Sequence, residues 1–148
     1  MKMKLASRFA RLQAIIIDII GVSFISMIVL LPTIIFKINT VIPLFLTQII
    51  MFILGLMIFY FLNRKSLIND GQTMGKSILK IKIVNADYTS ASKQTLLKRY
   101  SLLFLPSAIP FVGAWISAVN CLFIFTKDKR CIHDIMTNTI VVDVNKET

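Results

Sequence analysis

Residues 12–36 read LQAIIIDIIGVSFISMIVLLPTIIF, and this stretch decides how the chain folds. It is apolar beyond the roughly 20 residues that a helix needs to cross a bilayer, and Asp18 is its only charged residue. Holding a carboxylate at this depth costs roughly 2.5 to 3.5 kcal/mol on insertion scales, so such a side chain normally faces a partner, a cavity or a pathway. The run therefore predicts a transmembrane helix that carries a polar site.

Two further apolar runs follow, and the composition is that of a membrane protein. Of the 148 residues, 56% are hydrophobic and 16% are charged, with a mean hydropathy of +0.78, which soluble domains of this length rarely reach. Val41–Leu62 and Tyr100–Thr126 carry no charge and are each long enough to cross a bilayer. We expect one membrane domain over residues 1–148, with membrane segments at about 12–36, 41–62 and 96–126, a loop at 63–95 and a tail at 127–148.

The positions of the basic residues predict the orientation of these segments. Four bases precede the first run and eight lie between the second and third, whereas only Lys37 lies between the first and second. By the positive-inside rule we expect the N-terminus and the long loop to be cytoplasmic, in the cytoplasmic membrane of a prokaryote. The N-terminal bases also resemble those of a cleaved signal peptide. The apolar run is too long for one and no small-x-small cleavage site follows it, so we expect a retained signal anchor.

The third apolar run contains two prolines and poses a conflict of topology. A single crossing would leave Lys127, Lys129 and Arg130 on the outside, against the positive-inside rule. Pro106 and Pro110 would break or kink a helix, and broken backbone at membrane depth survives only where protein or a water-filled cavity surrounds it. We favour a helical hairpin that returns to the cytoplasmic side, with arms Leu96–Leu105 and Phe111–Phe125. A kinked single span is the alternative.

Two short segments favour β-strands. Ile78–Val84 and Thr139–Val144 are rich in β-branched residues and partly alternating. Neither is stable alone, and they can pair only if the loop and the tail share one side of the membrane. The predicted fold is an all-α membrane protein with two transmembrane helices, a third hydrophobic segment broken by proline, and a small cytoplasmic β-like element.

Several motifs that resemble active or binding sites lack the required pattern. The stretch 71–77, GQTMGKS, has three residues between its glycines where a phosphate-binding P-loop needs four, and an apolar helix precedes it. Cys121 and Cys131 have neither the spacing nor the neighbours of a metal site or a disulfide. His133 is the sole histidine, and it and the adjacent Asp134 do not share a helix face. We expect no enzyme, no metal site and no cofactor.

The face around Asp18 is the most coherent candidate site. Arg11, Ala14, Asp18 and Gly21 follow three-, four- and seven-residue steps, so they line one stripe of the first helix. The small Ala14 and Gly21 would let another helix approach and shelter the carboxylate. Asp18 is then either a structural lock, paired with a group elsewhere, or an ion or proton site. Polar groups elsewhere in the spans that would support such a site are Gln48 and Asn120.

Three blocks of residues carry a resemblance to a known family. They are Arg11-x-x-Ala14-x-x-x-Asp18, Gly71-x-Thr73-x-Gly75-Lys76, and His133-Asp134 followed by Thr139-x-Val141-Val142. In this order, over nearly the whole chain, they resemble the RDD family of small membrane proteins. The departures are Met74, where the family often has proline, and the two prolines of the third run. The resemblance implies that the name-giving arginine and two aspartates are Arg11, Asp18 and Asp134, with Thr73, Lys76 and Thr139 in the supporting positions.

The resemblance implies a transport-related role, with proton-coupled exchange of monovalent cations among the activities proposed for the family. Elementary chemistry is compatible with this, because burial favours a protonated carboxyl group and a nearby arginine favours an ionised one. If the hairpin brings Asp134 beneath the first span, Arg11 would pair with Asp134 at the membrane face. Because so few spans rarely enclose a pathway alone, we also expect a homo-oligomer.

The alternative function is a non-transporting accessory module. It would bind or regulate another membrane protein, or bind anionic lipid, through the polar face and the basic cytoplasmic surface. The net charge of +10 beside a membrane suits anionic headgroups as partners. We expect no nucleic-acid partner, because no recognition fold accompanies the bases.

Overall fold

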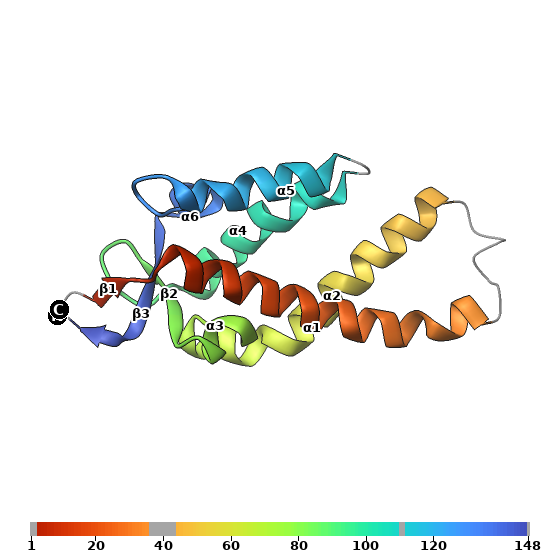
Figure 1. The fold of residues 1–148 in the computed structure, drawn as a ribbon, viewed down its shortest axis with the longest axis horizontal. Helices are drawn as coiled ribbons and strands as arrows, with labels where there is room; N and C mark the ends of the chain where they lie inside the picture. Colours follow the sequence, from red (N-terminus) through yellow and green to blue (C-terminus); the bar gives the residue numbers. More distant parts are fainter. Residues whose placement is uncertain (1–2, 36–43, 110–111, 148) are drawn as a thin grey trace.

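Two long helices form the body of the molecule. The computed structural model describes residues 3–35, 44–109 and 112–147, and in it α1 (Arg8–Ile35) and α2 (Leu44–Asp70) both extend away from a small sheet at one end (Figure 1). Both predicted transmembrane segments are therefore helices. Phe36, the loop that holds Lys37 and residues 41–43 lie outside the described residues.

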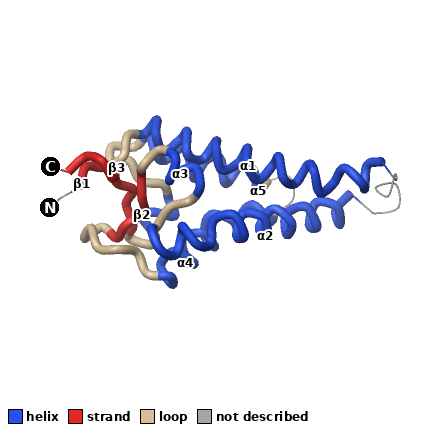
Figure 2. Tube along the Cα trace, turned by 90° about the horizontal axis from the view of Figure 1, so that it is seen from below, coloured by secondary structure: helices blue, strands red, loops and turns tan. Residues whose placement is uncertain are grey.

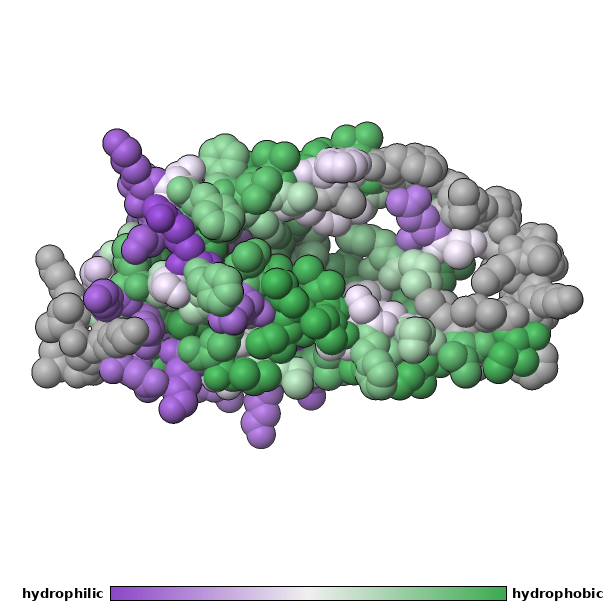
Figure 3. Space-filling model, viewed as in Figure 1, coloured by the Kyte–Doolittle hydropathy of each residue, from purple (hydrophilic) through white to green (hydrophobic). Residues whose placement is uncertain are grey.

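The surfaces of α1 and α2 suit a lipid environment. Arg8–Ile28 and Leu46–Asp70 are long and apolar enough to cross a membrane, and only 11% of each apolar window is buried inside the molecule. A helix that is apolar on its exposed faces is unstable in water and stable in hydrocarbon. In Figure 3 hydrophobic residues cover the helices, whereas hydrophilic residues gather at the end that holds the sheet.

The ends of these helices follow from local sequence. The Ser7 hydroxyl accepts a hydrogen bond from the Ala10 amide (3.1 Å) and so caps the start of α1. After α2 the chain turns at Gly71, whose φ of 66° is the left-handed conformation that glycine adopts at little cost, and its amide bonds to the Leu67 carbonyl (3.1 Å). The helix thus continues eight residues past Leu62, and much of the predicted loop 63–95 is regular structure.

The third apolar run is a helical hairpin, as predicted, and the alternative of a kinked single span is wrong. α4 (Lys93–Phe104) leads through a short 3₁₀ helix, η2 (Leu105–Ala108), to α5 (Gly113–Leu122), which turns back beside α4 before a last 3₁₀ turn, η3 (Phe123–Phe125) (Figure 1). Pro110, one of the two prolines expected to break the helix, lies with residue 111 outside the described residues.

Contacts at the tip hold the hairpin closed. The Ser107 and Ser117 hydroxyl groups lie 2.6 Å apart across it. Gly113 approaches the backbone of Pro106 and Ser107 so closely that a Cβ at this position would collide with their atoms. A residue without a side chain is therefore required where the second arm begins.

A three-stranded antiparallel sheet joins the N-terminal segment, the middle loop and the tail. Its order is β1 (Met3–Leu5), β3 (Thr139–Glu147), β2 (Ile81–Asn85), with Ile83 opposite Val141. Figure 2 shows the sheet at one end, with both termini, and the helices extending away from it. Paired strands cannot lie on opposite sides of a bilayer, so the three segments share one side of any membrane that the helices cross.

Two details of the sheet differ from the prediction. β2 begins at Ile81 rather than Ile78, because Ile78 ends a short helix, α3 (Met74–Ile78), and the chain then turns through Lys80 at a φ of 53°. β1 was not predicted at all. The buried core lies between this sheet and the nearby helices, and its members are Ala6, Ala14, Ile81, Ile83, Leu96 and Val141.

Candidate functional site

Asp134 is fully buried in the first turn of a short helix, α6 (Ile132–Met136). Its carboxylate accepts a hydrogen bond from the Cys131 amide (3.1 Å), the residue that caps the helix. This reciprocal cap explains why the chain turns into a helix here, since it satisfies an amide that the first turn leaves unpaired.

Two arginines from distant helices hold the same carboxylate. Arg11 of α1 donates from Nη2 to Asp134 Oδ2, and Arg99 Nη2 of α4 lies 2.5 Å from Oδ1. Burial raises the pKa of Asp134, but Arg99 and Arg11 outweigh burial and hold that pKa well below its usual range. The Arg11–Asp134 pair predicted from the sequence is present. Arg99, which the sequence did not single out, is the second base that keeps Asp134 ionised.

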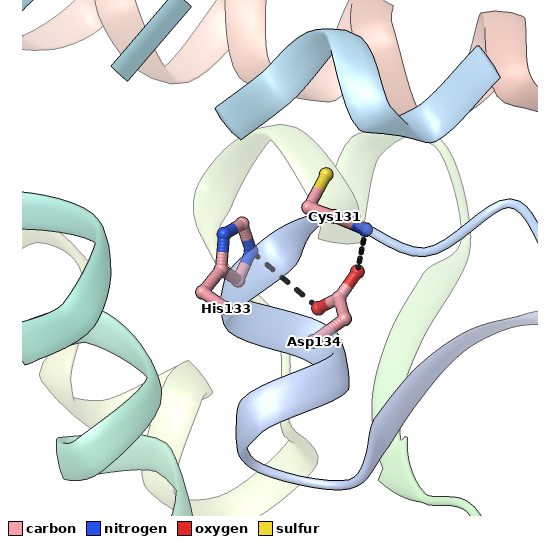
Figure 4. A group of neighbouring side chains, drawn as sticks. All are labelled: Cys131, His133 and Asp134. Carbon is pink, nitrogen blue, oxygen red and sulfur yellow. Dashed lines mark hydrogen bonds and ion pairs between the residues drawn. The ribbon is translucent and has the colours of Figure 1, made fainter. Parts of the chain in front are cut away.

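His133 also lies beside this carboxylate. We call Asp134 and the side chains around it, Arg11, Arg99 and His133 among them, the Asp134 cluster. His133 Nδ1 is 3.1 Å from Asn120 Oδ1, and its Nε2 is 3.3 Å from Arg99 Nη2 and 3.4 Å from Asp134 Oδ1. The two neighbouring side chains thus face each other, contrary to the prediction (Figure 4). Burial and Arg99 lower the pKa of His133 to about 3, so the imidazole is neutral.

Cys131, His133 and Asp134 bring three metal-ligand atoms within 4.8 Å of one another. The surroundings do not fit a cation, because the only carboxylate is already paired with two guanidinium groups and a metal would have to displace them. Burial raises the pKa of Cys131 to about 11, so it is a thiol rather than the thiolate that metals bind. In Figure 4 its sulfur points away from the carboxylate, and it donates to the Cys121 carbonyl (3.8 Å).

Asp18 lies in a second cluster, one to two turns further along α1. It accepts hydrogen bonds from the Thr73 hydroxyl (2.5 Å) and the Gly75 amide (2.8 Å). On the other side of α3, the Asn63 side chain accepts from the Met74 amide (2.6 Å). Side chains of α1 and α2 therefore satisfy two amides of the first turn of α3, which holds this short helix between them.

The close approach predicted around Asp18 occurs at Ala14 and not at Gly21. A Cβ on Gly75 would collide with the Ala14 carbonyl oxygen and touch the Asp18 carboxylate, whereas a Cβ on Gly21 would meet nothing within 4 Å. Ala14 is fully buried beneath α3. The five-residue helix α3 therefore packs against the small residue Ala14. Further along the same stripe of α1, the space beside Gly21 is open.

Lys76 lies beside Thr73. We call Asp18, Thr73, Gly75 and Lys76 the Asp18 cluster. Lys76 is 8% exposed, and its ammonium makes one long hydrogen bond, to Thr73 Oγ1 at 3.4 Å. Among the described residues no carboxylate lies within ion-pair distance of it. Burial and the nearby Arg99 lower the pKa of Lys76 from 10.5 to about 8, while Asp18 acts in the opposite direction. Its proton is therefore labile close to neutral pH.

Both clusters line one cavity of about 390 Å³ between α1, α2, α4 and α5. The polar end is formed by charged and polar side chains of both clusters, and aliphatic and aromatic residues line the rest. The charged and imidazole members are Arg11, Asp18, Lys76, Arg99 and His133. A cavity with one polar end thus lies between helices that are apolar outside.

The structure brings together all but one of the residues singled out from the sequence. Thr139 Oγ1 accepts from Arg99 (3.3 Å), and Asn120 binds His133, so both belong to the Asp134 cluster. Gln48 is exposed on α2, away from both. Arg99 and His133 are members that the sequence reasoning missed. A signal for Arg99 was present, since it immediately precedes an apolar run.

Comparison with known proteins identifies a family. The family model described as the RDD family matches residues 5–138, which include both clusters except Thr139. Comparison with curated proteins and with solved structures gives no match. The arginine and the two aspartates lie where the three motif blocks meet in space. The chain belongs to the RDD family.

Proposed function

We propose that this chain is a small, non-enzymatic transport unit of a prokaryotic cytoplasmic membrane, which exchanges protons for monovalent cations at the Asp18 cluster. One observation carries the proposal: the buried Lys76 ammonium shares the Thr73 hydroxyl with Asp18 at the wall of a cavity between apolar helices. A carboxylate, a hydroxyl group and a lysine that titrates near neutrality are the groups that such an exchange needs.

The exchange is a substitution of one cation for another. When Lys76 releases its proton, the cluster keeps the Asp18 carboxylate and gains a neutral amine, so a monovalent cation can take the place of the ammonium charge. When the proton returns, the ammonium displaces that cation. One proton moves for each cation, and the charge near Arg11, Arg99 and Asp134 stays constant. In this scheme the proton resides on Lys76, whereas the sequence left Asp18 as either a structural lock or an ion or proton site.

The topology supports the proposal. The sheet joins the N-terminal segment, the middle loop and the tail on one side, and the excess of bases in those segments favours the cytoplasm for that side. The Asp18 cluster then lies near the cytoplasmic face. The chain also exposes apolar and small residues along α1, among them Gly21, and we propose a homo-oligomer in which these faces help to enclose the outer half of a pathway.

Proteoliposomes that contain the pure protein and an internal pH dye provide the test. We expect a sodium, lithium or potassium gradient to drive a pH change with the parent protein, and both Asp18→Asn and Lys76→Met to abolish it. Asp70→Asn is the matched control, since it removes an exposed carboxylate at the end of α2 that leads to α3. No flux from a folded parent, or full flux from Lys76→Met, would refute the exchange.

The second candidate is an accessory module that binds another membrane protein or lipid without transporting ions. It is favoured by the fact that both carboxylates already have hydrogen-bond donors within the chain. In that case the Asp18 cluster is a structural joint between α1 and α3. Absence of flux, together with a loss of stability in Asp18→Asn, would favour this role.

A further inference from the structure

A groove on the surface between α2 and α4 has the form of a binding site for an acyl chain. It has a volume of about 520 Å³, and its walls are almost wholly apolar. Phe59 contacts the rings of Tyr100 and Phe104, with centroids 5.3 and 4.9 Å apart, and these three rings line both the groove and the cavity of the two clusters. The groove, which we call the α2–α4 groove, adjoins that cavity at these rings, and none of the charged or imidazole side chains of the two clusters lines it.

The two walls are matching helical stripes. Residues 52, 56, 59, 60, 63, 64, 67 and 68 of α2 face residues 93, 96, 97, 100, 101, 104 and 105 of the α4 arm. Each stripe recurs every three to four residues, as one face of a helix does. The α4 wall extends twelve steps from Lys93 to Leu105, about 18 Å at 1.5 Å per residue, and the same distance separates Phe52 from Arg64 on α2, where the wall continues for one more turn to Ile68. That length is close to half of the roughly 30 Å hydrocarbon thickness, which is one leaflet.

Charge distinguishes the two ends of the groove. Arg64 and Lys93 line it toward the sheet, and both are exposed. Neither forms an ion pair or a side-chain hydrogen bond among the described residues, and no carboxylate lines the groove. The opposite end, at Phe52 and Leu105, is apolar. Two unpaired bases at the membrane face above an apolar trough of leaflet length are complementary to an anionic lipid.

We infer that the α2–α4 groove binds an anionic phospholipid, with one acyl chain between the two stripes and the phosphate at Arg64 and Lys93. The apolar walls would take a chain of any phospholipid, so the bases provide the selectivity for a net negative headgroup. Each base near a membrane surface contributes roughly five-fold in affinity for anionic lipid.

The test is native mass spectrometry of the full chain in neutral detergent, titrated with phosphatidylglycerol or phosphatidylcholine. We expect one phosphatidylglycerol to bind the parent in preference to phosphatidylcholine. Arg64→Gln/Lys93→Gln should bind it at least ten-fold more weakly. The matched control is Lys65→Gln/Lys98→Gln, which removes the same charge from exposed neighbours on the same helices that do not line the groove. It should bind like the parent.

A second variant separates the groove from general surface attraction. Leu97 lines the groove and is 71% exposed, so Leu97→Trp fills it without disturbing the core. We expect weaker phosphatidylglycerol binding with no change in charge. The inference is overturned if the parent shows no preference, if the two double variants lose affinity equally, or if Leu97→Trp binds like the parent. It is also overturned if the groove variants dissociate a dimer that holds no lipid, since a second copy would then be the occupant.

Discussion

Asp134 and Asp18 are both carboxylates in the polar end of the molecule, yet their surroundings differ. Asp134 is fully buried between two guanidinium groups and a capping amide, so its negative charge is already paired. Asp18 is partly exposed, lines the cavity, and accepts only from a hydroxyl group and an amide, while Lys76 lies on the far side of that hydroxyl. The first arrangement fixes a structure, and the second leaves a carboxylate that the proposed exchange can use.

These different surroundings imply different roles for Asp134 and Asp18, although both aspartates belong to the motif of one family. Arg11 and Asp134 join the start of α1 to the tail and, through Arg99, to α4. A buried ion pair of this kind contributes little net stability over apolar residues, but breaking it is costly because a buried charge is left unpaired. The Asp18 cluster carries no such pair. We therefore expect the two aspartates to respond differently to the same substitution.

The largest effect should come from Asp134→Asn. It leaves the Arg11 and Arg99 guanidinium groups buried without an anion, and we expect a loss of about 3 to 5 kcal/mol, measured as the Tm in detergent. Asp18→Asn removes only charge-assisted hydrogen bonds and should cost about 1.5 to 3 kcal/mol. Equal losses would remove the distinction drawn between the two clusters.

Two controls sharpen this result. Asp128→Asn changes an exposed carboxylate in the loop before α6 and should stay within about 0.5 kcal/mol of the parent. In a double-mutant cycle of Arg11→Gln with Asp134→Asn we expect a coupling of about 0.5 to 3 kcal/mol. Additive effects would contradict the ion pair.

Substitution of Lys76 should change the pH dependence of stability. The pKa of Lys76 is about 8 in the folded protein and 10.5 when the side chain is fully solvated, so this side chain holds more protons in the unfolded chain between these values, and its contribution to stability rises with pH across that window. Lys76→Met removes the rise. Below pH 8 it should be more stable than the parent by up to about 3 kcal/mol, since each pKa unit corresponds to about 1.4 kcal/mol.

Thermal unfolding in detergent from pH 7 to 11 measures this effect. Lys98→Met, which changes an exposed lysine on α4, should keep the rise of the parent. If the difference in stability between the parent and Lys76→Met does not change over that range, Lys76 keeps an ordinary proton affinity, and the proposed exchange loses its titrating group.

The smallest effect tests the joint between α1 and α3. Gly75→Ala places a methyl group against the Ala14 carbonyl and the Asp18 carboxylate, and we expect a loss of about 1 to 3 kcal/mol, measured by thermal unfolding. Gly21→Ala enters open space within a helix and should be neutral, or stabilising by about 0.5 to 1 kcal/mol. If both alanines are tolerated, Asp18 is not held against α3 as the structure has it.

Much of this fold is predictable from the sequence, because its signals are local. Length and hydropathy predict α1 and α2, the two prolines and the following bases predict the hairpin, and β-branched runs predict β2 and β3. β1 has only three residues, too few for a pattern, and its place depends on pairing with β3. Lys80 at a left-handed φ ends the turn before β2, and the composition of residues 78–84 carries no signal for that turn.

The candidate site is less predictable because it is assembled from distant segments. Arg11, Asp18 and Asp134 are conspicuous by type and spacing, and the pairing of Arg11 with Asp134 follows once the hairpin is assumed. Arg99 looks like one of several bases in a loop, and its burial becomes evident only when α4 packs against α6. The partner of Asp18 is a hydroxyl group and a backbone amide, which hydropathy and charge do not reveal.

The order of the strands has a consequence for how the protein is made. β1 lies beside β3, and Arg11 binds a residue 123 positions later. During synthesis, β1 therefore has no partner strand until residues 139–147 have left the ribosome, by which time every apolar helix has already been made. Closure of the polar end is thus a late event in biogenesis, after the helices have formed. A chain interrupted before Asp134 would retain its hydrophobic helices and leave Arg11 and Arg99 without their carboxylate.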